Sequence, residues 1–446
     1  MLITNATLVT WNAEHPILND HALYIENGVI QAVGPTEVLI PHYRDAERLD
    51  AEGQMVLPGN ICAHTHFYGA YARGLGMPGA PPQNFPQILE KLWWPLDKAL
   101  DHESIRASAL LFLVDAVKRG TTTLIDHHAS PNAIDGSLDV IAQEVERAGL
   151  RAVLCYEVSD RDGKEKAEAG IAENVRFIKN HLAHPRIRGT FGLHASITLS
   201  DQTLQACTAA NPGEGFHIHV AEHEADEEDS VRHYNKRVVE RLRDLGILGD
   251  KSIVAHCVHI DQTELNILYG TRTWITHQPR SNMNNAVGVL PHLEQMLKME
   301  MRLCLGNDGF LGSMWEEWRM AYFLHKVASR NPQAAGGWDI VRIAVENNAA
   351  LAGRFFTGKR FGIIAEGAQA DLIFVNYQSF TPVTSGNIPW HILFGFEPDM
   401  VTLTMVDGHI LMQNRELITL QEDEILAEAR ALAPRVWERY HQFATR

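Results

Sequence analysis

Short apolar runs alternate with longer amphipathic stretches through the middle of this chain, and the alternation repeats eight times. Short apolar runs separated by segments with a period of about 3.6 residues are typical of strands alternating with helices. The predicted strands are 56–66, 122–127, 152–158, 187–194, 215–220, 252–259, 272–277 and 301–307. The predicted helices are 103–118, 138–148, 164–181, 201–209, 229–245, 262–269, 290–299 and 314–327. These units predict an α/β fold, a (β/α)₈ TIM barrel whose catalytic residues lie at the carboxyl ends of the strands.

Both ends of the chain are rich in short strand-like segments. Asn27-Gly28 and Asp407-Gly408 each separate two apolar runs, which is the strongest short-range signal for a hairpin. We therefore expect residues 1–57 and 359–420 to form one small β-sandwich domain beside a barrel of residues 58–358. A helix over 338–351 should close the barrel section. A C-terminal helix over 421–446 should lie outside it, kinked or split at Pro434.

The connection after the first predicted strand is unusually long. Residues 67–101 begin rich in Gly and Pro and end with Trp93-Trp94-Pro95. A connection of this length inside a compact domain is usually a lid or a binding segment, and a plain surface excursion is the alternative. Trp93 is a candidate to stack on a flat substrate, with packing inside the lid as the alternative role.

Polar side chains follow the apolar runs where the predicted strands end. The first strand ends in His64-Thr65-His66, and alternate strand residues face the same side, so both imidazoles could bind one metal ion. This pair alone is weak evidence, because two half-buried strand histidines would give the same pattern. The fifth to eighth strands also end in histidines or an acid, namely His219, His256, His277 and Asp308. In a barrel these strand ends meet at one mouth.

Three histidines and a carboxylate with an open position suit a catalytic divalent metal such as zinc. Such an ion lowers the pKa of bound water to about 7, which makes a nucleophile available at neutral pH. Glu222 follows His219 by three residues and could shuttle protons without binding the metal. His256 could hold the activated water or polarise the substrate, and Asp308 could be a ligand and accept a proton.

Composition and charge narrow the choice of partners. The formal net charge is -16 and the pI about 5.8, and an acidic surface repels phosphate backbones, so we expect no nucleic acid partner. The chain has no signal-like start and no apolar run of transmembrane length, so we expect no membrane partner. The five cysteines are not closely paired, which does not suggest disulfides and fits a reducing cytoplasm.

Five short motifs occur in order along the chain: Pro58-Gly59 with His64-x-His66, His219-x-x-Glu222, Ala255-His256-Cys257, His277-x-Pro279-x-Ser281-Asn282 and Asn307-Asp308-Gly309. Together they resemble the amidohydrolase superfamily, in its branch of metal-dependent deaminases and triazine chlorohydrolases. A closer resemblance is to the SsnA-like aminohydrolases associated with selenium metabolism. It rests on residues 126–132, 155–163, 281–286 and 391–395, and it extends over essentially the whole chain.

The resemblance implies a site with one divalent metal ion, zinc first, with iron or manganese as alternatives. The metal ligands that it implies are His64, His66, His219 and Asp308. Glu222 would be the proton shuttle, and His256 would contact the attacking water. His194 and His277 match family positions that lie close to the substrate. The resemblance also implies a homodimer.

Some residues depart from the family pattern. Gln278, a candidate substrate contact, stands where relatives often carry Asn or Cys, which leaves the substrate preference open. Asn60 replaces the usual apolar residue after Pro-Gly. Two-metal members use a modified lysine on the fourth strand, but residues 187–200 contain no lysine, which favours a one-metal site. Arg73 is a further candidate substrate contact, with a structural salt bridge as the alternative.

We therefore predict a metal-dependent hydrolase that deaminates a small amino-substituted N-heterocycle such as a purine, pterin or pyrimidine. The same residues could instead remove chloride or an alkylamine from a triazine-like ring. A metal-binding protein without turnover is the alternative from another class. Glu222 argues against that class, because a purely structural metal site needs no proton shuttle.

Overall fold

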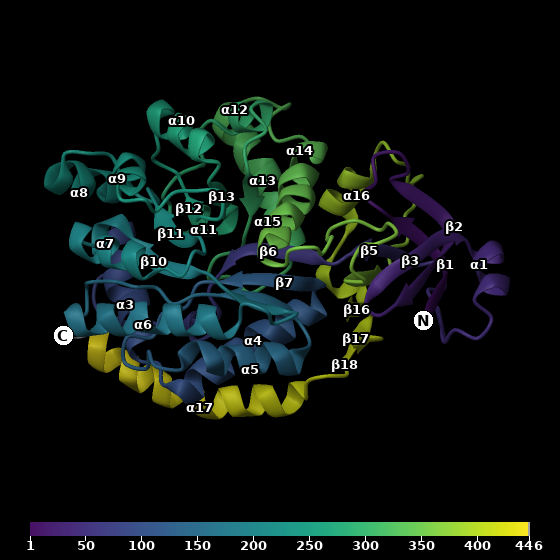
Figure 1. The fold of residues 1–446 in the computed structure, drawn as a ribbon, viewed down its shortest axis with the longest axis horizontal. Coiled ribbons are helices and arrows are strands. Elements are labelled where there is room, and N and C mark those ends of the chain that lie inside the picture. Colours follow the sequence, from purple (N-terminus) through teal and green to yellow (C-terminus); the bar gives the residue numbers. More distant parts are fainter. Residues whose placement is uncertain (445–446) are drawn as a thin grey trace.

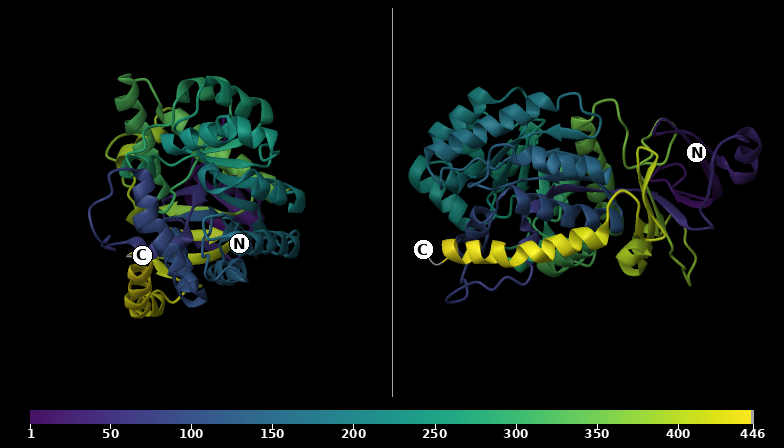
Figure 2. Two further views of the ribbon diagram at one scale, coloured as in Figure 1. Left: turned by 90° about the vertical axis from the view of Figure 1, so that its left-hand side faces the viewer. Right: turned by 90° about the horizontal axis from the view of Figure 1, so that it is seen from below.

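The computed structural model describes residues 1–444 and consists of two parts (Figure 1). One part holds parallel strands covered by helices, and the other is a sheet built from both ends of the chain. The C-terminal helix runs along the outside of the first part (Figure 2). Among the described residues, no helix combines the length and the apolar character that crossing a membrane requires.

The parallel strands form two sheets instead of one closed ladder. The first sheet has the order β6 (Asn60–Thr65), β7 (Thr121–Asp126), β8 (Arg151–Leu154) and β9 (Ile187–Gly189). The second has the order β10 (Phe191–Ala195), β11 (Phe216–Val220), β12 (Ile253–His256), β13 (Trp274–His277) and β14 (Leu303–Leu305). Isolated parallel bridges join Thr65 to Asp308 and Val158 to Leu193. The barrel-type arrangement is therefore present, but the ladder does not close, which corrects the expected closed (β/α)₈ barrel.

The predicted fourth strand is divided between the two sheets. It splits at Thr190 into β9 and β10, so that each sheet takes one half. Gly192 in β10 packs directly against the backbone of the segment around Tyr156. An added Cβ would lie 2.3 Å from the Tyr156 carbonyl oxygen. Glycine is needed at this close approach, and it allows the two sheets to meet near Val158.

Helices follow the strands largely as predicted. They are α4 (His102–Lys118), α5 (Ser137–Ala148), α6 (Lys164–Asn180), α7 (Asp201–Ala210), α8 (Glu224–Tyr234), α9 (Val238–Asp244), α10 (Gln262–Thr271), α11 (Pro279–Asn284), α12 (Leu293–Lys298) and α13 (Met314–Ser329). The single helix predicted over 229–245 is wrong, because Asn235 adopts a left-handed conformation with φ 53° and ends α8. The helix predicted over 338–351 is a longer run with a π-helical centre, α14 (Gly337–Val341), η4 (Arg342–Asn347) and α15 (Asn348–Phe355).

The long connection after β6 has helical structure of its own. Its segments are η1 (Phe67–Ala72), α2 (Phe85–Ile88), η2 (Leu89–Trp93) and α3 (Trp94–Lys98). The C-terminal helix α17 (Glu422–Ala444) supports this connection from outside. The Tyr440 hydroxyl donates to the Lys91 carbonyl oxygen at 2.5 Å, and Trp437 Nε1 donates to the Tyr71 carbonyl oxygen at 2.9 Å.

The expected break at Pro434 does not occur, because α17 continues through this residue as one helix. Proline removes one backbone hydrogen bond, but packing of an apolar face can compensate for that loss. That face is buried, and it consists of Ile425, Ala429, Leu432, Val436 and Tyr440.

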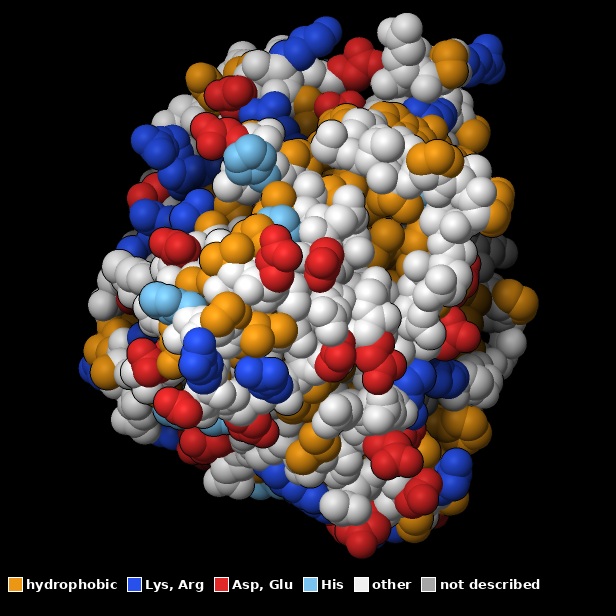
Figure 3. Space-filling view, turned by 90° about the vertical axis from the view of Figure 1, so that its right-hand side faces the viewer, with side chains coloured by type: hydrophobic (Ala, Val, Ile, Leu, Met, Phe, Trp, Pro, Cys, Tyr) orange, Lys and Arg blue, Asp and Glu red, His pale blue; other side chains and the backbone are white. Residues whose placement is uncertain are grey.

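The two ends of the chain form one mixed sheet of nine strands, not the two facing sheets of the expected sandwich. Its order is β18 (Glu416–Leu417), β17 (His409–Gln413), β16 (Val401–Val406), β15 (Leu372–Val375), β5 (Met55–Pro58), β1 (Leu2–Val9), β2 (Ile17–Glu26) and β3 (Val29–Pro35), with β4 (Arg48–Asp50) also paired to β1. Short helices α1 (Thr36–His42), α16 (Ile388–Gly395) and η5 (Pro398–Met400) flank it. On the face that carries this sheet, acidic and basic side chains are interspersed among apolar ones (Figure 3).

The chain passes from this sheet into the barrel part at Gly59. The predicted first strand, 56–66, is in fact β5 in the terminal sheet and β6 in the barrel. An added Cβ on Gly59 would lie 2.2 Å from Thr122 Cγ2, so glycine permits the tight crossing onto β7. This crossing fixes the start of β6 and therefore the position of the two histidines at its end.

Candidate metal centre and active site

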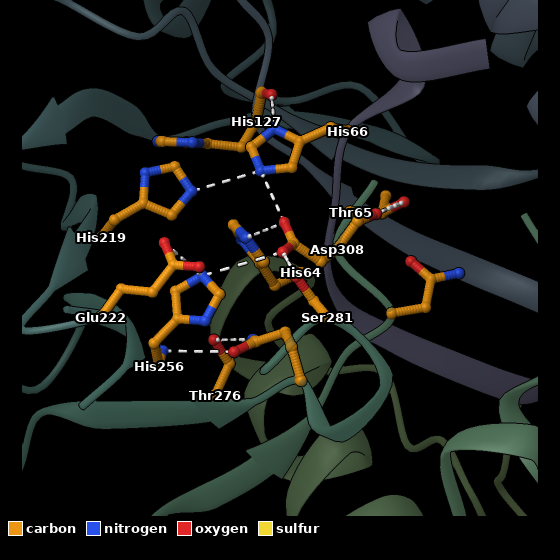
Figure 4. A network of polar contacts seen from close by, with 12 residues as sticks. His64, Thr65, His66, His127, His219, Glu222, His256, Thr276, Ser281 and Asp308 are labelled. Atoms are coloured by element: carbon orange, nitrogen blue, oxygen red, sulfur yellow. Dashed lines mark hydrogen bonds and ion pairs between the residues drawn. The ribbon is translucent and has the colours of Figure 1, made fainter. Parts of the chain in front are cut away.

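The carboxyl ends of the first, fifth, sixth and eighth strands bring their polar side chains together (Figure 4). His64 lies in β6 and His66 directly follows it, while His219 lies in β11. Asp308 follows β14, and the bridge between Thr65 and Asp308 places it beside β6. Parallel pairing therefore puts these ligand-type side chains at one edge of both sheets.

Short contacts link the four side chains. Asp308 Oδ1 lies 2.9 Å from His66 Nε2 and 3.3 Å from His64 Nε2. The Nε2 atoms of His66 and His219 lie 3.2 Å apart. All four residues are buried, so the contacts between them are shielded from bulk water.

The outer ring nitrogens of two of these histidines are held by acceptors. His66 Nδ1 lies 2.6 Å from the His127 carbonyl oxygen, and His219 Nδ1 lies 2.8 Å from the His194 carbonyl oxygen. A carbonyl oxygen only accepts hydrogen bonds, so each Nδ1 donates, and each Nε2 that has lost its proton turns a lone pair to the centre. The two Nε2 atoms lie 3.2 Å apart, so either a proton or a metal ion between them keeps their lone pairs from repelling each other. This arrangement, with the outer nitrogen held by an acceptor, is the usual one for metal-binding histidines.

Asp308 supplies the negative charge at the centre. Burial lowers the pKa of His66, but the hydrogen bond and charge of Asp308 outweigh it and raise the pKa to about 9, so this ring must give up a proton when it binds a metal ion. Burial raises the pKa of Asp308, but its hydrogen bonds to His64 and His66 hold that pKa well below its usual range. The Ser281 hydroxyl also donates to Asp308 Oδ2. The carboxylate is thus kept ionised, as a metal ligand must be.

Glu222 and His256 lie together beside this centre. Glu222 Oε2 is 3.5 Å from His256 Nε2, and His256 Nε2 is 3.9 Å from Asp308 Oδ2. His256 Nδ1 lies 2.9 Å from Asn282 Oδ1, which orients the ring. Burial, and then the charge of Asp308, raise the pKa of Glu222 well above its usual value. A carboxyl group with a raised pKa can carry a proton at neutral pH, as acid–base catalysis requires.

The backbone around these side chains is strained. Ala221, His256, Cys257 and Asp308 adopt positive φ angles of 47°, 72°, 52° and 56°. Non-glycine residues adopt such angles at a cost of about 1–3 kcal/mol each, and they cluster at functional sites. Next to Asp308, an added Cβ on Gly306 would lie 2.7 Å from the His64 carbonyl oxygen, so glycine lets β14 approach β6.

A cavity opens from the metal centre towards the lid. Its wall includes the metal-centre residues His66, His219, Glu222, His256 and Asp308. The lid contributes apolar and aromatic side chains, namely Tyr68, Phe85, Leu89, Trp93 and Trp94. His194 and Trp93, both predicted substrate contacts, lie on this wall. Among the described residues that line the cavity, six are acidic and none is Lys or Arg.

The other three predicted substrate contacts lie away from the cavity wall. Arg73 is exposed beyond the end of η1, in a groove against α17. His277 is fully buried, and its Nε2 lies 3.1 Å from His325 Nε2 on α13. Gln278 is also buried, accepts a hydrogen bond from the His256 N–H at 3.2 Å and donates to Thr276 Oγ1 at 2.7 Å. The hydrogen bond from the His256 N–H supports the backbone of His256.

Four acidic residues on the cavity wall were not among the predicted site residues: Glu90, Asp97, Glu157 and Asp226. Glu157 lies close to His127 and His66, and Asp226 accepts hydrogen bonds from the Ala221 and Ile197 N–H groups at 2.8 Å each. Glu157 stands inside the predicted strand 152–158, where nothing marks which side it faces. Asp226 belongs to the acidic start of a helix, where acids are common without any role in a site.

Fold and site together define a metal-dependent hydrolase of the barrel type. Residues 55–411 match the amidohydrolase family, and the chain belongs to that family. It is a hydrolase of carbon–nitrogen bonds other than peptide bonds, an aminohydrolase of that family. This result agrees with the resemblance found from the motifs.

Two relatives cover nearly the whole chain. The 5'-deoxyadenosine deaminase of Methanosarcina acetivorans is 30% identical over 442 residues, which are 97% of each chain. The 5-methylthioadenosine/S-adenosylhomocysteine deaminase of Pelotomaculum thermopropionicum is 30% identical over 448 residues, 98% of this chain and 99% of the other. Both names describe deaminases of adenine-containing compounds.

Two solved structures share the fold. An adenosine deaminase from Xanthomonas campestris with bound zinc has a TM-score of 0.86 at 24% identity and covers 98% of both chains. The atrazine chlorohydrolase of Arthrobacter aurescens, complexed with zinc, has a TM-score of 0.81 at 21% identity, with 97% of this chain and 100% of the other covered. The buried His/Asp cluster is therefore a metal-binding cluster within a fold that binds zinc in similar proteins.

Proposed function

We propose that this protein deaminates an adenine-type purine nucleoside that carries no 5'-phosphate, such as 5'-deoxyadenosine or 5'-methylthioadenosine. The observation that carries the proposal is the placement of Glu222 Oε2, 3.5 Å from His256 Nε2 and beside the metal centre. A metal centre next to a buried acid with a raised pKa suits hydrolysis in which protons must move. The names of the relatives support adenine as the base.

The residues of the centre take distinct roles in this proposal. The ion would be held by His64, His66, His219 and Asp308, the set that the family resemblance implies, with zinc as the first choice and iron or manganese as alternatives. The ligand atoms of His64, His219 and Asp308 lie within 4.8 Å of one another, and His66 Nε2 lies 2.9 Å from Asp308 Oδ1. When bound, a divalent ion lowers the pKa of a coordinated water into the neutral range. Glu222 takes a proton from the attacking water and passes it to the ring nitrogen beside the amino-bearing carbon. The second proton of the water leaves the new hydroxyl group, reaches Glu222 directly or through Asp308, and is given to the departing amine as the carbon–nitrogen bond breaks, so that one water is consumed and one ammonia is released.

His256 and Asp308 complete the acid–base system. His256 Nε2 lies between Glu222 Oε2 and Asp308 Oδ2, at 3.5 Å and 3.9 Å, and can hold the attacking water in place. Its other ring nitrogen is occupied by Asn282, so the Nε2 edge stays turned to the centre. Asp308 can accept a proton from the water in the first step, as well as serve as a ligand.

The cavity supports a nucleoside and argues against a nucleotide. Among the described residues its wall has no Lys or Arg, so a phosphate group would find no cationic side chain on the wall to pair with. The aromatic lid supports a flat base, because Trp93 and Trp94 present ring surfaces on which a purine can stack. An uncharged substituent at the 5' carbon agrees with the apolar lid residues.

Ammonia release tests the proposal. Zinc-loaded protein should release ammonia from adenosine, 5'-deoxyadenosine or 5'-methylthioadenosine, and at least 100-fold more slowly from adenosine 5'-phosphate. Glu222→Gln should keep its zinc and lose activity by about 10²–10⁴-fold. Glu224→Gln is the matched control, because Glu224 is exposed two residues away and should leave activity unchanged.

The test also separates the alternatives. If the protein released chloride or an alkylamine from a triazine and no ammonia from any purine, the deaminase proposal would be wrong. The protein would then be a hydrolase that removes chloride or an alkylamine from a triazine-like ring. Full activity of Glu222→Gln would overturn the proton-shuttle role. Arg73, His277 and Gln278 have no part in the proposal, because none lines the cavity. The narrower SsnA-like resemblance, the homodimer and the cytoplasmic location stay predictions.

A further inference from the structure

Glu157 is a buried carboxylate on the cavity wall that the proposed reaction does not use. Its side chain is almost completely enclosed, with 3% of the residue exposed. It lies just beyond β8, and its backbone N–H donates to the His128 carbonyl oxygen at 2.8 Å, which fixes it beside the end of β7. An ionised carboxylate in such a place requires partners, because burying an unpaired charge is costly.

One oxygen of Glu157 faces two histidine rings. Oε1 lies 3.1 Å from His127 Nδ1 and 3.4 Å from His66 Nδ1. Neither contact is an aligned hydrogen bond, because Oε1 and His127 Nδ1 have no hydrogen-bond partner and His66 Nδ1 donates to the His127 carbonyl oxygen at 2.6 Å. The other nitrogen of His127, Nε2, lies 3.0 Å from the His217 carbonyl oxygen. Oε1 is therefore enclosed by these rings and turned away from the cavity.

The second oxygen has no hydrogen-bond donor either. His194 Nε2 lies 3.8 Å from Oε2, which is beyond hydrogen-bond distance. His194 uses its other nitrogen for Thr198 Oγ1 at 2.7 Å. No residue between 1 and 444 donates a hydrogen bond to Oε2, although Glu157 and His194 both line the cavity. A carboxylate oxygen can accept about two hydrogen bonds, so this one is free for a ligand.

We infer that Glu157 is a substrate-specificity residue that accepts a hydrogen bond from an N–H or O–H group of the substrate. This inference rests on the proposed function and adds a requirement to it. β10, which carries His194, lies between Glu157 and the strand that leads to Glu222, so the donor belongs to a part of the substrate other than the reacting edge. In a purine nucleoside the donor is either a ribose hydroxyl or an amino group at position 2 of the base.

Binding to matched nucleosides tests the inference. The parent protein is zinc-loaded Glu222→Gln, in which turnover is blocked, and Kd is measured by calorimetry for three compounds. These are adenosine, 2',3'-dideoxyadenosine without the hydroxyls, and 2,6-diaminopurine riboside with an added amino group. We expect one missing or added donor to change the Kd of the parent by about 10-fold or more, as for a hydrogen bond to a charged group.

When Glu157→Gln is added to this parent, the ratio between the Kd values of the compounds should fall to less than about 3-fold. The amide carries no charge and has one oxygen in place of two, so it is a weaker hydrogen-bond acceptor than the carboxylate. Glu157→Asp keeps the charge beside His127 but withdraws the second oxygen, and it should also lose the preference. Zinc content and melting temperature verify that each variant is folded and loaded.

The outcomes separate this inference from the proposed function. Equal affinities of the parent for all three compounds, or the same ratios with and without Glu157→Gln, would overturn the inference. Loss of zinc in Glu157→Gln with unchanged ratios would also overturn it, and would leave Glu157 as a support of His127 and His66. Failure of the proposed function would appear separately, as no ammonia from adenosine with the unaltered protein.

Discussion

Arg151 Nη2 lies 2.7 Å from Asp407 Oδ1, and this contact ties the first residue of β8 to the terminal sheet. The same nitrogen lies 3.2 Å from Asp371 Oδ2. The guanidinium also lies 4.9 Å from the ring centre of Phe361, and the Arg151 side chain is fully buried. One guanidinium thus contacts two acids at the junction of the two parts, and Lys359 Nζ lies 3.4 Å from the same Asp407 oxygen.

Replacing this guanidinium should loosen the junction. Arg151→Met leaves Asp371 buried without its partner, and we expect stability to fall by about 3–5 kcal/mol. The midpoint of urea unfolding measures the change. Arg147→Met is the control, because Arg147 is 44% exposed in its contact with Glu144 and its loss should cost less than about 1 kcal/mol. Similar midpoints for the two variants would show that the junction does not depend on Arg151.

Removal of a proposed metal ligand should release the metal. His219→Ala should lower the zinc content from about one ion per chain to nearly none, because a catalytic site with few protein ligands tolerates no such loss. The melting temperature should fall by several degrees, since a bound ion stabilises only the folded state. Elemental analysis and a melting curve give both results, with His233→Ala as the exposed control. Unchanged zinc content would remove His219 from the centre.

A pair of buried acids should make stability depend on pH. Burial, and then the charge of Glu264, raise the pKa of Glu227 to about 9, although Arg237 Nη2 lies 3.4 Å from it. An unfolded glutamate has a pKa of about 4.3. Between these two values the folded chain holds a proton that the unfolded chain has lost, so stability falls as the pH rises through this range.

Glu227→Gln should remove this dependence. The amide keeps an acceptor for the Val238 N–H and carries no charge to bury. Relative to the unaltered protein, the variant should gain about 1–3 kcal/mol between pH 6 and pH 8. Unfolding midpoints at the two values measure the gain, and Glu224→Gln is the exposed control. If the stabilities of Glu227→Gln and of the unaltered protein changed equally with pH, the raised pKa of Glu227 would be contradicted.

Two lid residues should differ in their effect on the substrate. Trp93 lines the cavity and Arg73 does not. Trp93→Ala should raise KM by about 10-fold or more, as expected when a base loses an aromatic stacking partner. Arg73→Ala should leave KM within about twofold. Steady-state kinetics with the best purine substrate give the KM of each variant. A larger increase in KM for Arg73→Ala than for Trp93→Ala would show that the substrate extends out of the cavity.

The metal centre could be predicted because its residues directly follow apolar runs. His64, His219 and Asp308 stand at or just past strand ends, where the carboxyl ends of parallel strands must meet. The side that a residue faces is harder to predict. His277 turns towards His325 on α13, and a shift of one residue along a strand would reverse that direction. Glu157 was missed for the same reason.

The shape of the sheets depends on contacts that sequence patterns do not contain. Gly192 and Gly59 allow close approaches to Tyr156 and Thr122, which lie far away in the chain. The apolar pattern over 187–194 is continuous, so it predicts one strand where the structure has two. Asn235 likewise ends a helix inside a segment whose pattern continues, because its left-handed backbone is a local choice.

The bridge between Thr65 and Asp308 has a consequence for the order of folding. The Thr65 hydroxyl donates to the Asp308 carbonyl oxygen across a separation of 243 residues. Contacts between such distant residues form late, because the chain between them must first be ordered. The ligands of the first and last strands therefore meet only when the last strand has docked. Metal uptake should be among the final events on the folding pathway, and a chain that ends before Asp308 should lack the site.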